Sequence, residues 1–286
     1  MRVGIRLPNE TGPEPDAIRR LATMAEELGF DSIWLDAHVV APARIESRYP
    51  LSPSGKTSLR AESSYADPLV VLAYAAAVTE RLRLGTSVIP MLSVDPLSLA
   101  KRAATLDLVS GGRLELGIGA GWLLEEAVIL GRPTDHPNAR MAEAIDLMRT
   151  GWREGVFEWH GRFYDVPRVG IHPLPPQRDR VPLWIGGMGE SAVRICVEKG
   201  AGLMLSRATP QVAASFKARL RAAPSGGLLG CSLGFSPADD VATWRATARA
   251  YRDAGVQLLM IGGRTADLPE DRLSLFAREV LPELSA

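Results

Sequence analysis

The feature that most constrains the fold is a regular alternation of short apolar runs with longer segments of helical periodicity. Short apolar runs predict buried parallel strands, and apolar residues at three- and four-residue spacing predict helices. We expect strands at 3–7, 32–35, 82–88, 114–118, 182–185, 203–205, 228–235 and 257–261. We expect helices at 16–28, 68–78, 97–109, 139–152, 191–199, 210–221, 238–254 and 268–281, with Ser236 capping the helix at 238–254.

Strands and helices that alternate in this way over 286 residues predict an α/β fold, a single (β/α)8 TIM barrel spanning residues 1–286. An open, doubly wound sheet is the structural alternative. Two insertions interrupt the rhythm: a polar, Pro- and Ser-rich stretch at 41–66 after the second strand, and residues 153–180 before the fifth. We expect 41–66 to be a lid loop, with a passive surface loop as the alternative. The segment FEWHGRFYDV within 153–180 predicts a small hairpin.

Charge and cysteine content narrow the class of protein. The 33 Lys and Arg balance 33 Asp and Glu, which disfavours a nucleic-acid binder, and no basic run suggests a membrane patch. Neither a signal peptide nor an apolar stretch of about 18 residues is present, so we expect a cytoplasmic protein with no membrane partner. Cys196 and Cys231 are expected to be buried free thiols, and the four scattered histidines predict no metal site.

Glycine-rich turns follow two of the predicted strands, at the end of a barrel where active sites form. In PLWIGGMGESAVRI a strand enters a glycine turn and a helix begins near Ser191, which suits a phosphate, although such glycines also serve turn geometry alone. The segment GRLELGIGAGW carries GxGxG rather than the full dinucleotide fingerprint, so a Rossmann site is disfavoured. Glycines there suit a flat ring lying against the backbone.

His38 is the only histidine predicted at the C-terminal end of a strand. It is a candidate proton donor or cofactor ligand, with a purely structural histidine as the alternative. Glu125 and Glu126 follow on the strand-four loop, where we favour an interpretation as charges that complement a helix dipole. Arg48 and Arg60 on the long loop are interpreted as solvated surface charges rather than anion ligands.

Three segments together resemble one family: DSIWLDAHVV, the block from ERLRLGTSVIPMLSVD to GRLELGIGAGWLLEE, and VPLWIGGMGESAVRICVEKGAGLM. They resemble the luciferase-like monooxygenase superfamily, and in particular its coenzyme F420-dependent oxidoreductase branch. The resemblance implies a TIM barrel that holds a flavin or deazaflavin at its C-terminal face. It also implies a bulge with a non-prolyl cis peptide bond after the third strand, here Ser87–Val88 or a neighbouring bond.

The resemblance also suggests roles for individual residues. It matches His38 to the catalytic, ring-proximal histidine and places Trp122 and Glu125 at the substrate pocket. The cofactor-binding positions that it implies are Asp36, Ser87, Val88, Ile89, Ala120, Gly121, Gly187, Met188, Gly189, Glu190 and Ser191.

This sequence departs from the family pattern at three points. Sugar-phosphate dehydrogenases of the superfamily have a glutamate where this chain has Trp122 and an aspartate where it has Ala37. Glucose-6-phosphate chemistry is therefore not carried over. The strand-four loop also lacks the arginine with which bacterial luciferase holds the FMN phosphate, and this weakens the case for FMN.

Three functions follow as hypotheses. The leading one is an F420-dependent oxidoreductase that transfers hydride between the deazaflavin and a small organic substrate. The second is an FMN-dependent two-component monooxygenase that uses O2 and reduced flavin from a partner reductase. The third is a flavin- or deazaflavin-binding protein without turnover. F420 is thus the expected cofactor and FMN the alternative. We also expect a homodimer, as is common in the resembling family.

Overall fold

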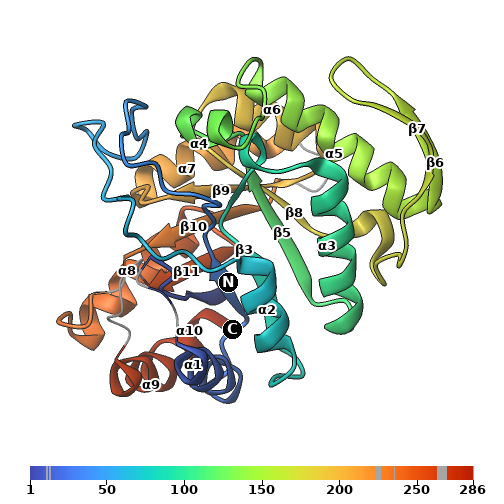
Figure 1. Cartoon of the computed structure of the whole chain (residues 1–286). Coiled ribbons are helices and arrows are strands. Elements are labelled where there is room, and N and C mark those ends of the chain that lie inside the picture. Colours follow the sequence, from blue (N-terminus) through green and yellow to red (C-terminus); the bar gives the residue numbers. More distant parts are fainter. Residues whose placement is uncertain (11, 13, 223–226, 235, 263–268, 286) are drawn as a thin grey trace.

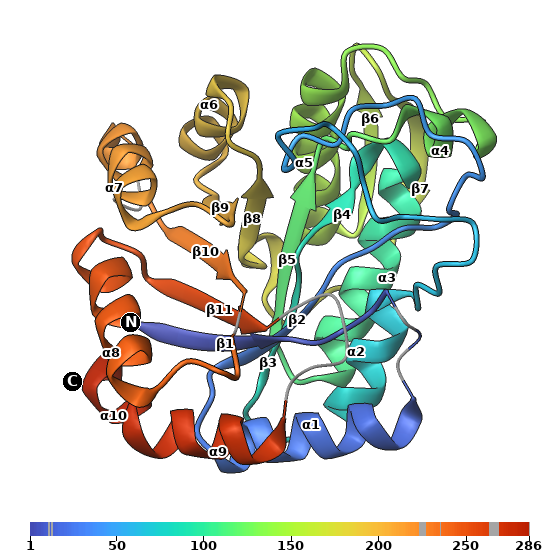
Figure 2. The same ribbon diagram turned by 90° about the vertical axis from the view of Figure 1, so that its left-hand side faces the viewer.

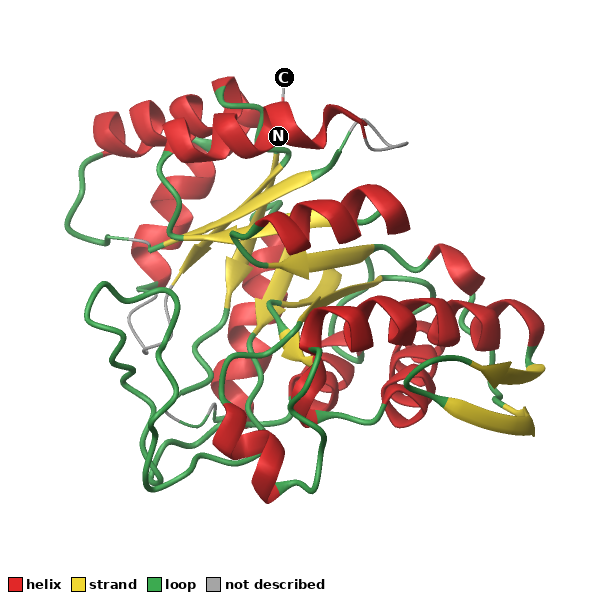
Figure 3. Ribbon diagram, turned by 90° about the horizontal axis from the view of Figure 1, so that it is seen from above, coloured by secondary structure: helices red, strands yellow, loops and turns green. Residues whose placement is uncertain are grey.

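The computed structural model describes residues 1–10, 12, 14–222, 227–234, 236–262 and 269–285. Within this part of the chain, parallel strands form a closed barrel in the order β3-β2-β1-β11-β10-β9-β8-β5, and the pairing of β3 with β5 closes it. The predicted α/β TIM barrel is confirmed, and Figures 1 and 3 show helices surrounding the strands. The barrel strands are β1 (Arg2–Arg6), β2 (Ser32–Leu35), β3 (Arg83–Thr86), β5 (Leu114–Gly119), β8 (Leu183–Gly186), β9 (Gly202–Ser206), β10 (Leu229–Leu233) and β11 (Leu258–Gly262).

Helices connect the strands and cover the outside of the barrel (Figure 2). They are α1 (Pro15–Glu27), α2 (Pro68–Ala76), α3 (Pro96–Val109), α4 (Leu124–Ile129), α5 (Pro137–Glu154), α6 (Glu190–Lys199), α7 (Pro210–Arg219), α8 (Val241–Asp253), α9 (Glu270–Glu279) and α10 (Leu281–Ser285). Short 3₁₀ turns lie at Met91–Ser93, Arg178–Arg180 and Leu220–Ala222. The predicted hairpin before β8 is present as the antiparallel strands β6 (Val156–His160) and β7 (Asp165–Gly170).

Side-chain caps explain where several helices begin. Asp67, Asp95 and Thr209 accept hydrogen bonds from the free N–H groups of the first turns of α2, α3 and α7. The prediction that Ser236 caps the next helix is wrong. Asp240 accepts from the N–H of Thr243, so α8 begins at Val241.

The third strand departs from its expected length. We predict one strand over 82–88, but β3 ends at Thr86 and the Ser87–Val88 peptide bond is cis. This is the bond that the family resemblance indicates. A two-residue strand, β4 (Ile89–Pro90), then pairs with the end of β5. Val88 therefore occupies a bulge between two strand pieces, at the C-terminal end of the barrel.

Two tryptophans fill the barrel interior. The rings of Trp34 and Trp184 meet edge to face with centroids 6.2 Å apart, and both side chains are fully buried. Glycines on the neighbouring strands leave the space for them, because a Cβ atom at Gly85 would lie 2.1 Å from Trp34 and one at Gly202 would lie 2.5 Å from Trp184. The interior is therefore a packed core and not a channel.

A charged cluster closes the N-terminal end of the barrel. The buried carboxylate of Glu115 accepts hydrogen bonds from Trp184 Nε1 at 2.7 Å and from Arg2 Nη1 at 2.5 Å. Arg83 Nη1 donates to the same carboxylate at 3.2 Å, and Arg2 also pairs with Asp31 at 3.4 Å. Burial disfavours the charge on Arg2, but its hydrogen bond to Glu115 outweighs this effect and the pKa of Arg2 is raised.

Cys196 and Cys231 are buried free thiols, as predicted. Burial raises the pKa of each to about 12, so both stay protonated near neutral pH. None of the helices in the described part of the chain is long and apolar enough to cross a bilayer.

Candidate functional site

A cavity of about 480 Å³ lies at the C-terminal end of the barrel. It brings together residues that are far apart in the sequence, at the ends of seven barrel strands and in the loops that follow them. The predicted site residues that line it are Asp36, His38, Ser87, Val88, Ala120, Gly121, Trp122, Gly187, Met188, Gly189, Glu190 and Ser191. Two predicted residues do not line it: Ile89 packs into the core, and Glu125 faces the long loop.

Val88 forms part of the cavity floor. Its side chain packs on the interior cluster that contains Trp34 and Trp184. A Cβ atom at Gly119 or Gly186 would approach Val88 to 2.9 Å, so glycine at both strand ends makes room for the bulge. The adjacent Ser87 lines the cavity, and its buried Oγ has no hydrogen-bond partner in the described part of the structure. A hydroxyl in this state is available to a bound ligand.

His38, at the end of β2, pairs with Glu126 on α4. The distance from His38 Nδ1 to Glu126 Oε2 is 3.1 Å, and the other carboxylate oxygen accepts from the N–H groups of Val39 at 2.6 Å and Val40 at 3.2 Å. Burial by itself raises the pKa of Glu126, but hydrogen bonding to His38 and the backbone outweighs it and lowers the pKa. Glu126 is therefore an ionised, fully buried partner of the histidine.

Sequence reasoning missed this role of Glu126, which we interpret there as a charge that complements a helix dipole. The sequence did offer one indication of burial, because Glu126 lies in a segment that also carries apolar residues. Glu126 has no exposed surface, so solvation of a surface charge does not explain its presence.

Aromatic rings connect His38 to the long loop. The imidazole meets Tyr65 edge to face with centroids 5.1 Å apart and Trp122 at 6.0 Å. Trp122 in turn contacts Tyr49, whose ring centroid lies 5.0 Å away. Trp122 therefore forms a cavity wall and also packs against the loop over the barrel mouth.

Glu125 holds this loop from the neighbouring position on α4. Its Oε1 accepts hydrogen bonds from the N–H groups of Glu46 at 2.8 Å and Ser47 at 2.9 Å. Burial raises the pKa of Glu125, but the hydrogen bonds from Ser47 and Glu46 outweigh it and lower the pKa. The expected place of Glu125 in the substrate pocket is corrected accordingly, because its carboxylate points to the loop backbone.

The turn after β8 also lines the cavity, three strands around the barrel from the end of β2 that carries His38. Gly187 adopts a φ of +155°, a conformation that side chains rarely allow. Gly189 is the N-cap of α6, and a Cβ atom built on it would meet nothing within 4 Å. The first N–H groups of α6 have no partner within the helix, so this turn is suited to an anion.

A polar wall completes the cavity, and of its residues only Asp36 was predicted from the sequence. Arg6 Nη2 donates to Asp36 Oδ2 at 2.7 Å, and Ser232 Oγ donates to Ser206 Oγ at 3.2 Å. Arg6 is the only Arg or Lys among the described residues that line the cavity. It extends from β1, four strands away around the barrel from β8. Arg6 could have been found from the sequence, because it is a charged residue within the apolar run 3–7 that is expected to be buried.

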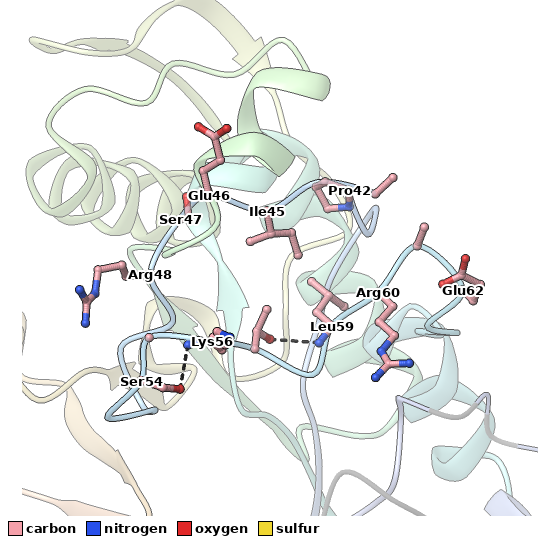
Figure 4. Close-up of a pocket in the computed structure, with 14 residues that line it drawn as sticks. Pro42, Ile45, Glu46, Ser47, Arg48, Ser54, Lys56, Leu59, Arg60 and Glu62 are labelled. Atoms are coloured by element: carbon pink, nitrogen blue, oxygen red, sulfur yellow. Dashed lines mark hydrogen bonds between the residues drawn. The ribbon is translucent and has the colours of Figure 1, made fainter.

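The long loop encloses a separate hollow of about 650 Å³, shown in Figure 4. Arg48 and Arg60 line it and are both exposed. Neither lines the barrel cavity, which fits their interpretation as surface charges. Elsewhere in the described ranges, His, Cys, Asp and Glu side chains form no group of three that is arranged to hold a metal.

Known proteins share this fold over its whole length. A monooxygenase from Streptomyces bottropensis, RslO1, superposes with a TM-score of 0.78 at 22% identity, covering 99% of this chain and 100% of that one. The coenzyme F420-dependent tetrahydromethanopterin reductase of Methanopyrus kandleri also gives 0.78, at 17% identity and 99% coverage of both chains. At these identities the likeness concerns the fold.

Sequence comparison adds a functional relative and a family. The F420-dependent glucose-6-phosphate dehydrogenase of Kineococcus radiotolerans is 31% identical over 191 residues, which is 66% of this chain and 51% of that protein. This chain spans 60% of the length of two curated mycobacterial relatives that have no assigned function. The family model described as luciferase-like monooxygenase matches residues 1–277. With the cavity at the mouth of a closed barrel, this match shows that the chain belongs to the luciferase-like monooxygenase family.

Proposed function

We propose that this chain is an F420-dependent oxidoreductase that transfers hydride between the deazaflavin and a small organic substrate. One observation carries the proposal: His38, the glycine turn before α6 and the Ser87 hydroxyl, which has no partner among the described residues, converge on a single cavity. In this order, they can exchange a proton with the substrate, bind the phosphate of a cofactor, and donate a hydrogen bond to its ring. The F420-dependent relative at 31% identity supports this choice among the cofactors used in the family.

The residues present fit such a cofactor. Val88 and the glycines at 119 and 186 offer a flat, apolar floor for a tricyclic ring, and Ser87 Oγ offers it a hydrogen bond. The N–H groups at the start of α6 suit the phosphate. When bound there, F420 accepts or gives hydride through its C5 carbon.

The side chains then divide the remaining work. His38 accepts or supplies the proton that accompanies hydride transfer, because its ring lines the cavity beside the floor. Trp122 forms a wall of the substrate pocket. Tyr49, Pro50 and Leu51 of the long loop reach the same cavity, so we propose that the loop excludes water from the reacting groups. Ala37 and Trp122 distinguish this pocket from that of sugar-phosphate dehydrogenases.

The test is a pair of titrations with purified protein. Protein fluorescence is followed while F420 or FMN is added, and we expect saturable binding of F420 with much weaker binding of FMN. A panel of alcohols and carbonyl compounds is then screened for changes in F420 absorbance. Tight FMN binding without F420 binding would reject the proposal.

A second candidate, an FMN-dependent monooxygenase, is favoured by the fold match to RslO1 and by the description of the family model. An arginine for the FMN phosphate is the feature to look for. Arg6, the only described Arg or Lys that lines the cavity, lies across the barrel from the glycine turn and already pairs with Asp36. We therefore rank this function second.

The remaining alternatives have their own tests. Cofactor binding without turnover of any substrate in the panel favours a non-catalytic binding protein. The homodimer expected from the resemblance stays a prediction, which light scattering at several concentrations tests.

A further inference from the structure

We propose that Glu126 is a positioning residue that fixes His38 in the tautomer with its proton on Nδ1. Nε2 is then the atom that accepts a proton from the substrate. The catalytic part of this inference rests on the proposed function. The tautomer is a property of the chain alone and can be measured without cofactor.

The two carboxylate oxygens of Glu126 have different partners. Oε1 already accepts from the N–H groups of Val39 and Val40, and Oε2 lies 3.1 Å from His38 Nδ1. An ionised carboxylate has no proton to donate. A hydrogen bond between Glu126 and Nδ1 therefore requires the proton to be on the imidazole, at Nδ1.

The other ring nitrogen then follows from the chemistry of imidazole. A neutral ring with its proton on Nδ1 has a lone pair on Nε2. In the described part of the chain, Nε2 makes no hydrogen bond, and the ring lines the cavity. Tyr65 packs edgewise against the ring, and the ion pair of Arg6 with Asp36 lines the same cavity.

These constraints define the proton step in the oxidative direction. The substrate O–H or N–H bond breaks and its proton goes to Nε2 of His38. The adjacent C–H bond would break and its electron pair would leave with the hydrogen as hydride, for which a bound F420 would be the acceptor. The substrate would gain a double bond, His38 would carry the positive charge of the proton, and the hydride would add one negative charge to the cofactor. In the reverse direction the protonated Nε2 returns the proton.

Glu126→Gln provides a sharp test because it preserves shape and reverses polarity. The two backbone N–H groups require an acceptor, so the amide oxygen of Gln takes the place of Oε1. The amide NH2 then faces Nδ1 and can only donate. Nδ1 must accept, which moves the imidazole proton to Nε2.

The matched control is Glu125→Gln, the same substitution one residue earlier. Among the described residues, Glu125 accepts from Glu46 and Ser47 of the long loop, and no hydrogen bond joins it to His38. Glu125→Gln therefore removes a charge from α4 without removing a contact to the imidazole, whereas Glu126→Gln removes both.

The first readout is 15N NMR of histidine-labelled protein without cofactor, with His38→Gln used to assign the resonances. We expect the Nδ1–H tautomer in wild type and in Glu125→Gln, and the Nε2–H tautomer in Glu126→Gln. An Nε2–H tautomer in wild type would overturn the proposal, and this outcome does not depend on the folding of Glu126→Gln.

The second readout is turnover with F420. We expect kcat of Glu126→Gln to fall by roughly a hundredfold or more, the scale of a misplaced acid–base group. Its affinity for F420 should change by less than about threefold. Adding Glu126→Gln to His38→Ala should cause no further loss, because both changes remove the same function.

The outcomes separate this inference from the proposed function. Full activity of Glu126→Gln alongside an inactive His38→Ala would reject the positioning role. Absence of F420 binding by wild type would reject the proposed function. In that case the NMR measurement still decides whether Glu126 sets the tautomer.

Discussion

The two ends of the barrel are built from the same strands and differ in how their polar groups are used. At the N-terminal end, buried Glu115 accepts hydrogen bonds from Arg2, Arg83 and Trp184. At the C-terminal end, polar side chains surround a cavity, and the buried Ser87 hydroxyl has no partner in the described structure. One end of the barrel is therefore arranged for stability and the other for a ligand.

Glu115→Ala tests the N-terminal end of the barrel and should have the largest effect on stability. It leaves the Arg2 guanidinium and the Trp184 N–H without their carboxylate partner. We expect the free energy of unfolding to fall by about 3–5 kcal/mol, as for other broken buried ion pairs. Urea denaturation followed by tryptophan fluorescence measures it. Glu158→Ala, at an exposed position, is the control. A loss below about 1 kcal/mol would mean that the cluster contributes little.

His38→Ala tests the C-terminal end of the barrel, where the cavity lies. We expect turnover with F420 to fall by roughly a hundredfold or more. The free energy of unfolding should fall by about 1–3 kcal/mol, less than for Glu115→Ala, because only Oε2 of the buried Glu126 loses its partner. Steady-state kinetics and urea denaturation of the same preparation give both numbers. A loss of stability as large as that of Glu115→Ala, without a loss of turnover, would contradict the division between the two ends.

A pair of glycine substitutions compares the packed interior with the cavity rim. A Cβ atom at Gly85 would lie 2.1 Å from Trp34, so Gly85→Ala should cost about 1–3 kcal/mol of stability through overpacking. A Cβ atom at Gly189 meets nothing within 4 Å, so Gly189→Ala should leave stability within about 0.5 kcal/mol. It should weaken F420 binding if the turn holds the phosphate. Thermal unfolding and fluorescence titration measure the two effects, and normal F420 affinity would remove this turn from the site.

The pH dependence of Glu126→Gln gives the smallest effect. The pKa of Glu126 is lowered below 4.5 in the folded protein, so its ionised form stabilises the fold above pH 4.5. This contribution is lost as the pH falls from 4.5 through the folded-state value. We expect wild type to exceed Glu126→Gln by about 1 kcal/mol at pH 7, and the difference to shrink in acid. Urea midpoints at pH 7 and pH 4 measure it, and a difference that grows in acid would have the wrong sign.

The barrel could be predicted from the sequence because buried parallel strands and amphipathic helices carry strong periodic patterns. The small elements could not. Helix α4 has 6 residues, too few for a periodic signal, and β4 has 2. The cis bond at Ser87–Val88 came from the family resemblance and not from periodicity.

The candidate site was predictable where a strand end identifies a residue. His38 and the glycine turn before α6 were found in this way, and both line the cavity. The contact between His38 and Glu126 joins residues 88 positions apart, and no local pattern encodes it. Glu125 and Glu126 look equivalent in sequence, yet helix geometry directs one to the loop and the other to the histidine.

The interlock of the two tryptophans with their glycines has a consequence for how such barrels diverge. Alanine at Gly85 clashes with Trp34, while a smaller residue at 34 leaves a void in the interior. Neither position can drift alone without loss of stability, so the two must change together. We expect related chains that replace one member of the pair to carry a compensating replacement at the other. The barrel interior is therefore inherited as a unit, while the loops around its mouth are free to vary with substrate.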